Sequence, residues 1–422
     1  MRYQAALRPD GAFIIAIYTG HHDVRPGPCS GAFVTKLSSS ALAGASLLLQ
    51  MSHRSPSRQS CSFPKPLYFA AVILVLASPC LAIDSGKVTS SKVADGVYLF
   101  TTTRYGDVGF GGNAVAILTD DGVVIFDTSG TPSSAQAMLA ELRKLTTKPV
   151  LYVINSHWHW DHWGGNHVFK QAYPNVQFLS SEKNRDLMKN IAVAWNKPGL
   201  ERDLPDYIAQ QKQQLAAAEA KHAPESELAE MRELLAADED FLQQKRSVIY
   251  TFPNVVFSQS VTLFLGSREI RVLHARAITP GDTYVYLPKE KILITGDILV
   301  NPIPFAVGGS YPQDWIATLQ ALNALDVEAI IPGHGEVEHD KTYLRQNLTL
   351  FRHVTSDVQK AHAEGRSLQE TQTALGNNAA IYAADISLPE QRLPAFKAYF
   401  LEVFVNRTYH ELEKPLGDSP TS

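Results

Sequence analysis

The feature that most constrains the fold of this 422-residue chain is a histidine-rich run directly after a short apolar segment. Residues 149–154 (Pro-Val-Leu-Tyr-Val-Ile) have the composition of a buried strand, and residues 156–162 (Ser-His-Trp-His-Trp-Asp-His) follow it. A histidine cluster on an exposed loop is an ordinary surface feature. Here the strand fixes the backbone and two tryptophans limit solvent, so three imidazoles and a carboxylate predict a transition-metal site.

The composition is that of a globular protein with a sizeable core, because 45% of the residues are hydrophobic and 19% are charged. The length suits one large domain or two ordinary ones. The formal net charge is −4 and there is no run of Lys or Arg, so we expect no nucleic-acid partner.

The N-terminal region has the layout of a secretory signal peptide. An apolar run at 67–76 follows the basic residues Arg54, Arg58 and Lys65, and small residues lead to Ala82. The run is short for a membrane anchor, which is the alternative. We therefore predict cleavage after Ala82, contact with a membrane only through this segment, and a periplasmic or secreted protein. Residues 1–50 would make an abnormally long leader, which suggests that translation begins at Met51.

The three cysteines of the chain lie at or before the predicted cut, at Cys29, Cys61 and Cys80. The mature protein would then have no thiol, so it could form no disulfide and could use no cysteine as a nucleophile or metal ligand.

The segment before the histidine run predicts alternating strands and helix. Three β-rich segments come first, at 96–100, 114–118 and 123–126. Asp120-Asp121-Gly122 is a hairpin signal between the last two. Thr131-Pro132 then predicts a helix start, with a capping hydroxyl and a proline in the first turn. Strand, helix and strand in this order indicate a layered α/β arrangement.

Residues 182–246 differ in kind, since they are polar, rich in Gln, Glu and Ala, and helical in pattern, with Leu228, Met231 and Leu235 as an apolar stripe. Pro224 is placed to begin a new helix. We expect a helical insertion here, either a solvated helical pair or a lid over the metal site.

Strands resume after this insertion, at 261–265, 270–273, 283–287 and 291–294. A helix is predicted at 313–325 and a further strand at 329–331, and the remainder to about residue 412 is helical in pattern. The segments 90–170 and 255–335 share a strands-then-helix order, which suggests two similar lobes packed face to face.

Three further polar residues follow apolar strand segments: Asp127, Asp297 and His334. A single Asp after a strand is most often a turn residue or helix cap. Together with the histidine run, however, these residues resemble the metallo-β-lactamase-fold superfamily over about residues 90–340. The resemblance implies a four-layer αββα sandwich. We expect a domain at 83–340 that includes the helical insertion, and, from the helical pattern of the remainder, a C-terminal helical extension at 341–422 packed on it.

The resemblance also implies a metal centre in the cleft between two sheets. His157 and His159 correspond to ligands of a first metal, and Asp161, His162 and His334 to ligands of a second. Asp297 corresponds to the carboxylate that bridges both. Asp127 corresponds to the residue behind the ligands that orients the histidine loop.

The chain departs from the family at one ligand position. The superfamily has a further histidine in a Gly-His-Thr-x-Gly-Asp turn, and here Ile278 stands in that position, within Ala277-Ile278-Thr279-Pro280-Gly281-Asp282. His274, four residues upstream, could replace it only by a local rearrangement. We therefore expect one or two zinc ions, with the second site the stronger.

A metal centre of this kind predicts hydrolysis, because a bound ion lowers the pKa of a water from about 15.7 towards about 7. Asp161 or Asp297 would take or relay the proton. We expect a small-molecule substrate with an ester, thioester, lactone or amide group, including β-lactams. The alternative is a degenerate member of the family in which Ile278 has ended catalysis and the cleft binds a ligand or partner.

Overall fold

The computed structural model describes residues 2–7, 13–18, 87–103 and 111–417. The predicted signal peptide, its cleavage point after Ala82, the proposed start at Met51 and the three cysteines all lie outside the described residues. Within the described residues no helix is both long enough and apolar enough to cross a membrane.

Two short strands near the N-terminus, β1 (Arg2–Leu7) and β2 (Phe13–Tyr18), form an antiparallel pair. The sequence analysis predicted no element in this region. The pair fits the β-branched and aromatic residues of β2.

A seven-stranded sheet holds the strands of the first half in sequence order from β3 to β9. The pairs from β3 to β6 are antiparallel, and those from β6 to β9 are parallel. Its strands are β3 (Val88–Ala94), β4 (Val97–Thr102), β5 (Ala114–Leu118), β6 (Val123–Phe126), β7 (Val150–Ile154), β8 (Gln177–Ser181) and β9 (Val255–Phe257).

A five-stranded sheet holds the strands of the second half, also in sequence order, and only its last pair is parallel. Its strands are β10 (Ser260–Leu265), β11 (Arg268–Ala275), β12 (Asp282–Leu287), β13 (Ile292–Val300) and β14 (Ala329–His334). The strands predicted from sequence in both halves are therefore confirmed, and the predicted meander is β10 to β13.

The two sheets pack face to face through one apolar cluster. Ile117 and Ile154 of the first sheet and Val285 and Ile331 of the second are all buried in it. Strands such as β5, β6 and β12 are buried on both faces, which explains their nearly continuous apolar sequence.

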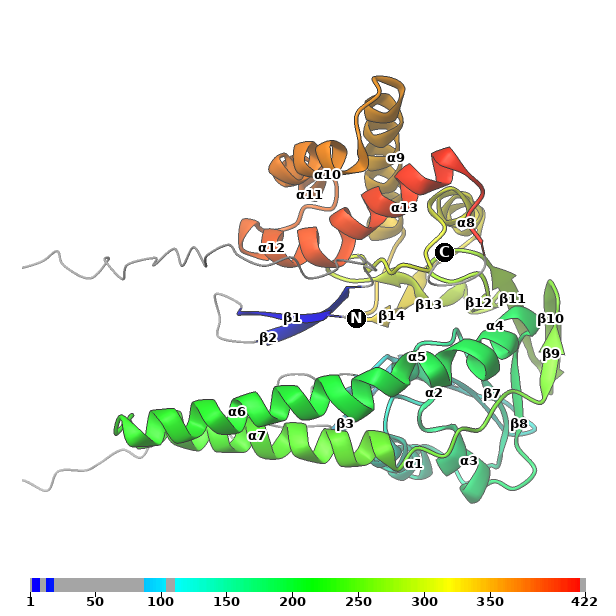
Figure 1. Ribbon diagram of the computed structural model, residues 1–422. Coiled ribbons are helices and arrows are strands. Elements are labelled where there is room, and N and C mark those ends of the chain that lie inside the picture. Colours follow the sequence, from blue (N-terminus) through cyan, green and yellow to red (C-terminus); the bar gives the residue numbers. More distant parts are fainter. Residues whose placement is uncertain (1, 8–12, 19–86, 104–110, 418–422) are drawn as a thin grey trace, which may run out of the picture. The chain divides into compact units, whose positions relative to one another are not determined.

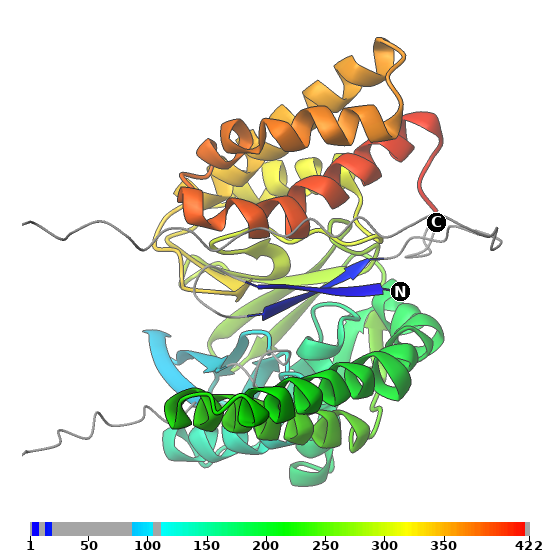
Figure 2. The same ribbon diagram turned by 60° about the vertical axis from the view of Figure 1, so that its left-hand side comes forward.

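Helices cover the outer face of each sheet (Figures 1 and 2). On the seven-stranded sheet, α1 (Pro132–Leu145) and α3 (Asn166–Ala172) bury Met138 and Phe169. On the five-stranded sheet, α8 (Pro312–Ala324) and α9 (Thr342–Ala363) contribute Trp315 and Phe351 to the largest cluster. The order helix, sheet, sheet, helix confirms the predicted four-layer αββα sandwich.

The start of α1 follows from its sequence. Thr131 is the N-cap, its side chain accepts a hydrogen bond from the backbone N–H of Ser134 at 3.2 Å, and Pro132 opens the helix. The Thr131 hydroxyl satisfies one of the free N–H groups of the first turn, and Pro132 has no N–H that would need a partner. The helix therefore begins where the sequence predicted.

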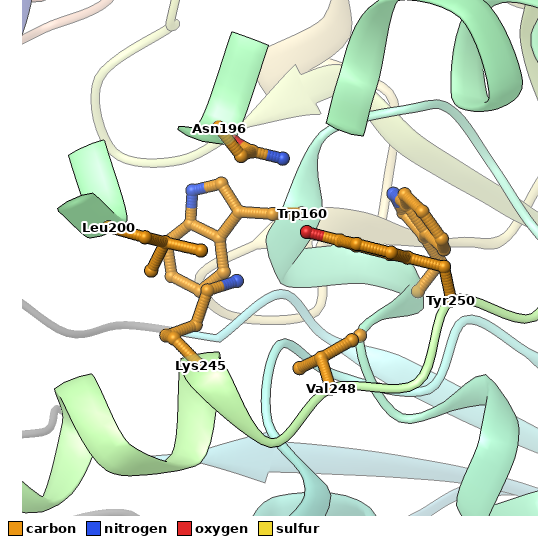
Figure 3. A pocket seen from close by; sticks show the side chains of 8 residues that line it. Trp160, Asn196, Leu200, Lys245, Val248 and Tyr250 are labelled. Carbon is orange, nitrogen blue, oxygen red and sulfur yellow. The ribbon is translucent and has the colours of Figure 1, made fainter. Parts of the chain in front are cut away.

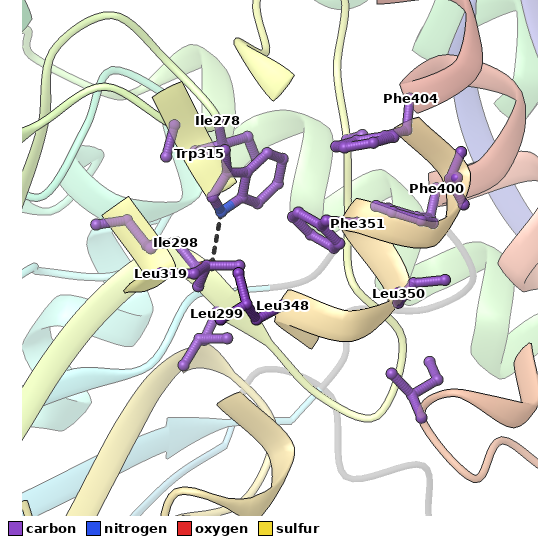
Figure 4. Close-up of a cluster of buried hydrophobic side chains, with 14 of the residues drawn as sticks. Ile278, Ile298, Leu299, Trp315, Leu319, Leu348, Leu350, Phe351, Phe400 and Phe404 are labelled. Atoms are coloured by element: carbon purple, nitrogen blue, oxygen red, sulfur yellow. Dashed lines mark hydrogen bonds between the residues drawn. The ribbon is translucent and has the colours of Figure 1, made fainter. Parts of the chain in front are cut away.

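The region after residue 341 is helical, as predicted. Besides α9 it contains α10 (Leu368–Asn377), α11 (Ala379–Ala384), α12 (Leu393–Phe396) and α13 (Glu402–Glu413). Phe404 of α13 and Phe400, in the π-helical turn before it, contact Phe351 of α9 with ring centroids 4.8 and 4.9 Å away (Figure 4). The extension therefore shares the core of the second sheet's outer face.

The predicted insertion is helical from α4 (Glu182–Leu187) to α7 (Glu225–Arg246), with π-helical turns at Met188–Ala192 and Gly199–Asp203. Its two long helices, α6 (Leu204–Ala220) and α7, pair with each other (Figure 1). The end of the pair where α6 leads into α7 is mostly exposed, which fits the solvated interpretation. The other end, with Leu204 and Phe241, is the near end, and it is buried against Trp160 of the domain.

Candidate metal centre

Polar side chains gather where strands of both sheets end. β7 leads into the histidine run, β6 leads to Asp127, and His334 is the last residue of β14. Asp297 differs from the sequence prediction, because β13 continues past it to Val300. The register with β14 shifts on both sides of Gly296, whose φ is +53°, and this irregularity places Asp297 within the strand.

The six predicted ligands form two groups, and within each group one ligand atom per residue lies within 4.8 Å of the others. His157, His159 and Asp297 form the first group, and Asp161, His162 and His334 form the second. The division is the one that the family resemblance implied for the two metals.

Asp297 lies between the two groups. Its Oδ2 is 3.5 Å from Nε2 of His157, and its Oδ1 is 3.2 Å from Nε2 of His162 and 3.5 Å from Nε2 of His334. Asp161 contacts its own group, because its Oδ2 lies 3.1 Å from Nε2 of His334. One carboxylate with an oxygen facing each group is the arrangement that a bridging ligand needs.

Asp127 contacts the ligands from behind. Its Oδ2 lies 2.8 Å from Nδ1 of His162 and accepts a hydrogen bond from the Ser156 hydroxyl at 2.6 Å. Oγ of Ser156 is in turn 2.9 Å from Nδ1 of His157. Because Nδ1 of each ring is engaged, Nε2 of His157 and His162 is turned toward the centre. The sequence analysis predicted an orienting position for Asp127 but missed the connection through Ser156.

Two glycines allow the ligands to approach the backbone. A Cβ on Gly112 would lie 2.5 Å from Cε1 of His162, and a Cβ on Gly333 would lie 2.0 Å from Oδ1 of Asp297. Both positions therefore require the absence of a side chain.

Asn113 was missed by the sequence analysis and fixes the loop that carries His334. Its buried side-chain amide donates to the carbonyls of Pro332 and Gly335, both at 2.9 Å, and its backbone N–H donates to Gly333 at 2.7 Å. These three bonds hold the residues on both sides of His334 against the end of the first sheet.

The pKa values of the second group and of Asp297 are set by burial and by one another's charges. Burial raises the pKa of Asp161 and Asp297, but His162 and His334 outweigh it and hold both pKa values well below the usual range. Burial lowers the pKa of His162 and His334, but the two carboxylates outweigh it and raise both. The two carboxylates and the two imidazoles therefore favour each other's charged forms.

His159 behaves differently, because burial and the neighbouring His157 lower its pKa to about 3. A neutral imidazole is the form that binds a metal ion.

Among the described residues, the buried atoms Nε2 of His162 and Oδ1 of Asp297 have no hydrogen-bond partner. Buried polar atoms without partners are costly. The donor set of imidazoles and carboxylates thus fits a divalent metal such as zinc.

A sequence model of the metallo-beta-lactamase superfamily matches residues 107–334, which is more than half of the chain and includes all six predicted ligands. The chain belongs to the metallo-beta-lactamase superfamily.

Within this superfamily, the chain is similar to a linear primary-alkylsulfatase from Pseudomonas sp. (strain ATCC 19151), with 22% identity over 55% of this chain and 43% of that protein. The aligned part is thus less than half of the alkylsulfatase. The chain is also similar to a metallo-beta-lactamase type 2 from Elizabethkingia meningoseptica, with 22% identity over 64% of this chain and 86% of that protein. A solved metallo-beta-lactamase from Pontibacter korlensis superposes with a TM-score of 0.44 and 18% identity, over 63% of this chain and 99% of that one.

Ile278 is the residue that the family resemblance places at the position of a metal-ligand histidine. Ile278 is fully buried in the apolar cluster that also contains Ile298 and Trp315 (Figure 4). Nε1 of Trp315 donates to the carbonyl of Ile298, the residue after Asp297, at 3.0 Å. Ile278 is thus part of the apolar core of the second sheet's outer face, and its side chain carries no donor atom.

His274, the possible substitute, does not join either group of ligands within the described residues. Its Nε2 lies 3.1 Å from the carbonyl oxygen of Pro280. The turn itself is held by Asp282, which accepts hydrogen bonds from the backbone N–H groups of Ala277 and Thr279 at 3.0 Å. Burial raises the pKa of Asp282 to about 6. Because neither Ile278 nor His274 supplies a ligand, the first group has two imidazoles, those of His157 and His159.

Proposed function

We propose that the protein is a zinc-dependent hydrolase that acts on a small molecule with an ester, thioester, lactone or amide group, β-lactams included. The observation that supports this most directly is the pair of three-ligand groups that share the carboxylate of Asp297. Membership of the superfamily supports it independently.

In this proposal the first zinc is held by His157, His159 and Asp297, and the second by Asp161, His162 and His334. The second group has two imidazoles and its own carboxylate, and it also faces Asp297. The first group lacks the imidazole that Ile278 replaces. We therefore propose one or two ions per chain, with the second site the stronger.

Zinc, when bound, supplies a Lewis acid for the substrate oxygen and lowers the pKa of water. The chain's own residues do the rest. Asp127 and Ser156 fix the rings of His162 and His157. Asp161 and Asp297 are the carboxylates of the two groups, and either would take or relay the proton.

Export to the periplasm or the medium is also part of the proposal, supported by the apolar run and small residues before Ala82. Protein isolated from its native host should then begin at Ile83 or within a few residues, as N-terminal sequencing would show. A chain in the cytoplasm that retains residues 1–82 would contradict export and leave the hydrolase proposal standing.

The test of the hydrolase combines metal analysis with a substrate panel. Protein reconstituted at neutral pH should contain zinc, and it should hydrolyse at least one of a chromogenic ester, thioester, lactone and cephalosporin. A sulfate ester belongs in the panel because one similar protein is an alkylsulfatase. Absence of any transition metal after reconstitution would overturn the proposal.

A second candidate function is a binding protein that has lost catalysis, and the buried Ile278 favours it. It predicts zinc at a single site with no turnover of any panel member. Hydrolysis that disappears in a chelator and returns with zinc would exclude it.

A further inference from the structure

Trp160 stands between two predicted ligands, His159 and Asp161, and its side chain packs against the helical insertion. Its ring centroid lies 5.5 Å from that of Phe241. Nζ of Lys245 lies 3.8 Å from the ring centroid, and Figure 3 shows this lysine beside the indole. Both partners belong to the near end of α7. Trp160 also packs on the apolar cluster that α6 and α7 form with Leu204 and Ile208.

The six-membered part of the same ring also rests on the domain. A Cβ on Gly130 would lie 2.5 Å from Cζ3 of Trp160, so the indole fits directly against this glycine. Beside it, Gln244 of α7 accepts a hydrogen bond from the backbone N–H of Ser133 at the start of α1, at 3.2 Å. The insertion is thus attached to the domain at the histidine loop and at the start of α1.

We propose that the helical insertion is a buttress for the metal centre, in which Phe241 and Lys245 are positioning residues that hold the histidine loop in place by clamping Trp160. The metal part of this inference rests on the proposed function, whereas the effect on the loop itself does not.

The physical reason is the place of Trp160 in the chain. Residues 155–159 have no regular secondary structure, and α2 (Trp160–Trp163) is a single turn of helix. Such a segment has little stability of its own. Metal ligands must be held within about 0.5 Å of their working positions, which requires packing by neighbouring residues. An aromatic ring held between α7 and Gly130 restricts the backbone of the ligands directly before and after it.

The first test needs no metal. Hydrogen–deuterium exchange of peptides covering 156–165 is measured on metal-free, full-length protein for the wild type and for the Phe241→Ala and Lys245→Ala variants. We expect exchange in this segment to accelerate by roughly tenfold in each variant. The control is Leu228→Ala, which truncates a buried side chain of α7 about 20 Å further along the helix. It should loosen the outer part of the pair and leave exchange in 156–165 within about twofold of the wild type.

The second test measures zinc affinity by competition with a chromogenic chelator. Phe241→Ala and Lys245→Ala should weaken zinc binding by about tenfold, a loss typical of residues behind the ligands. Lys245→Arg, which keeps a cation over the indole, should restore affinity, and Leu228→Ala should not change it. If wild-type protein binds no zinc, the proposed function fails and the exchange measurement still decides this inference. Equal exchange in 156–165 for all four proteins would overturn it, as would a loss in Leu228→Ala as large as in Phe241→Ala.

Discussion

Oδ2 of Asp127 lies 2.8 Å from Nδ1 of His162, and both side chains are buried. Asp127 has a positive φ of 60°, which is uncommon for a residue with a side chain. The same carboxylate accepts from the backbone N–H of Ser156 at 2.8 Å and from its hydroxyl. Asp127 therefore fixes the start of the histidine loop. It orients the ring of His162 directly and the ring of His157 through Ser156.

Replacing Asp127 should weaken the metal centre without removing a ligand. Asp127→Asn keeps the size of the side chain but loses the charge that aligns Nδ1 of His162. We expect a loss of zinc affinity of about 10- to 100-fold, measured by chelator competition. Asp95→Asn, at a carboxylate that is 99% exposed, is the matched control and should bind zinc as the wild type does. Unchanged affinity in Asp127→Asn would show that His162 is oriented by other contacts.

Asn113→Ala should destabilise the protein and displace His334. The substitution leaves the carbonyls of Pro332 and Gly335 without their donor, and we expect a loss of about 1–3 kcal/mol in the free energy of unfolding. Zinc affinity should fall as well, because His334 is on the loop that these bonds hold. Denaturant unfolding and chelator competition measure the two effects. Lower stability with unchanged affinity would show that the loop keeps its position without Asn113.

Part of this centre was predictable from sequence because its signals are local. The strand before His157, the cap at Thr131 and the helical pattern of 182–246 each lie within one continuous segment. The contacts of Asn113 were not predictable, because its side-chain partners are 219 and 222 residues away along the chain. The clamp on Trp160 likewise joins residues that only the packing of α7 brings together. Asp297 was predicted at a strand end because Gly296 interrupts the apolar pattern, yet the apolar residues after it extend the strand to Val300.

The resemblance to a family added what local signals could not supply. The residue types at Asp297 and His334 are common at strand ends, and only the family pattern assigned them to a shared centre. The structure brings them together with the histidine run. Their roles as metal ligands remain predictions until zinc is measured.

The stability of the protein should depend on pH through Lys245, whose side chain is only 9% exposed. Burial lowers the pKa of this lysine to about 7, although the field of Asp161 opposes the shift. The unfolded chain keeps this proton up to the usual value of 10.5, so between about pH 7 and pH 10 the unfolded state binds more protons. The cost of burying the cation is therefore largest below pH 7 and is relieved as the pH rises.

Lys245→Met removes this titration while keeping an unbranched side chain over Trp160. We expect the gain in stability of Lys245→Met over the wild type to shrink by roughly 3 kcal/mol between about pH 6 and pH 9.5, since one pKa unit corresponds to about 1.4 kcal/mol. Denaturant unfolding at both pH values measures it. In Lys212→Met, where the lysine is 57% exposed, the pH dependence should follow the wild type. A constant difference between Lys245→Met and wild type would show that Lys245 keeps its proton throughout this range.

Ile278→His restores a donor at the turn where the superfamily places a ligand. The side chain of Ile278 is fully buried beside Trp315, so the exchange removes apolar packing and buries an imidazole. We expect the metal-free variant to lose about 1–3 kcal/mol of stability. If the imidazole reaches His157 and His159, zinc per chain should rise, and so should the rate on any substrate that is hydrolysed. Ile278→Val is the matched control, because it changes the packing by one methylene and adds no donor. It should lose about 1 kcal/mol of stability and leave zinc content unchanged.

Unchanged zinc content and rate in Ile278→His would show that this position does not face the first group. Increased zinc content without hydrolysis would show that the site is recoverable but that catalysis was lost for another reason, which favours the binding-protein function.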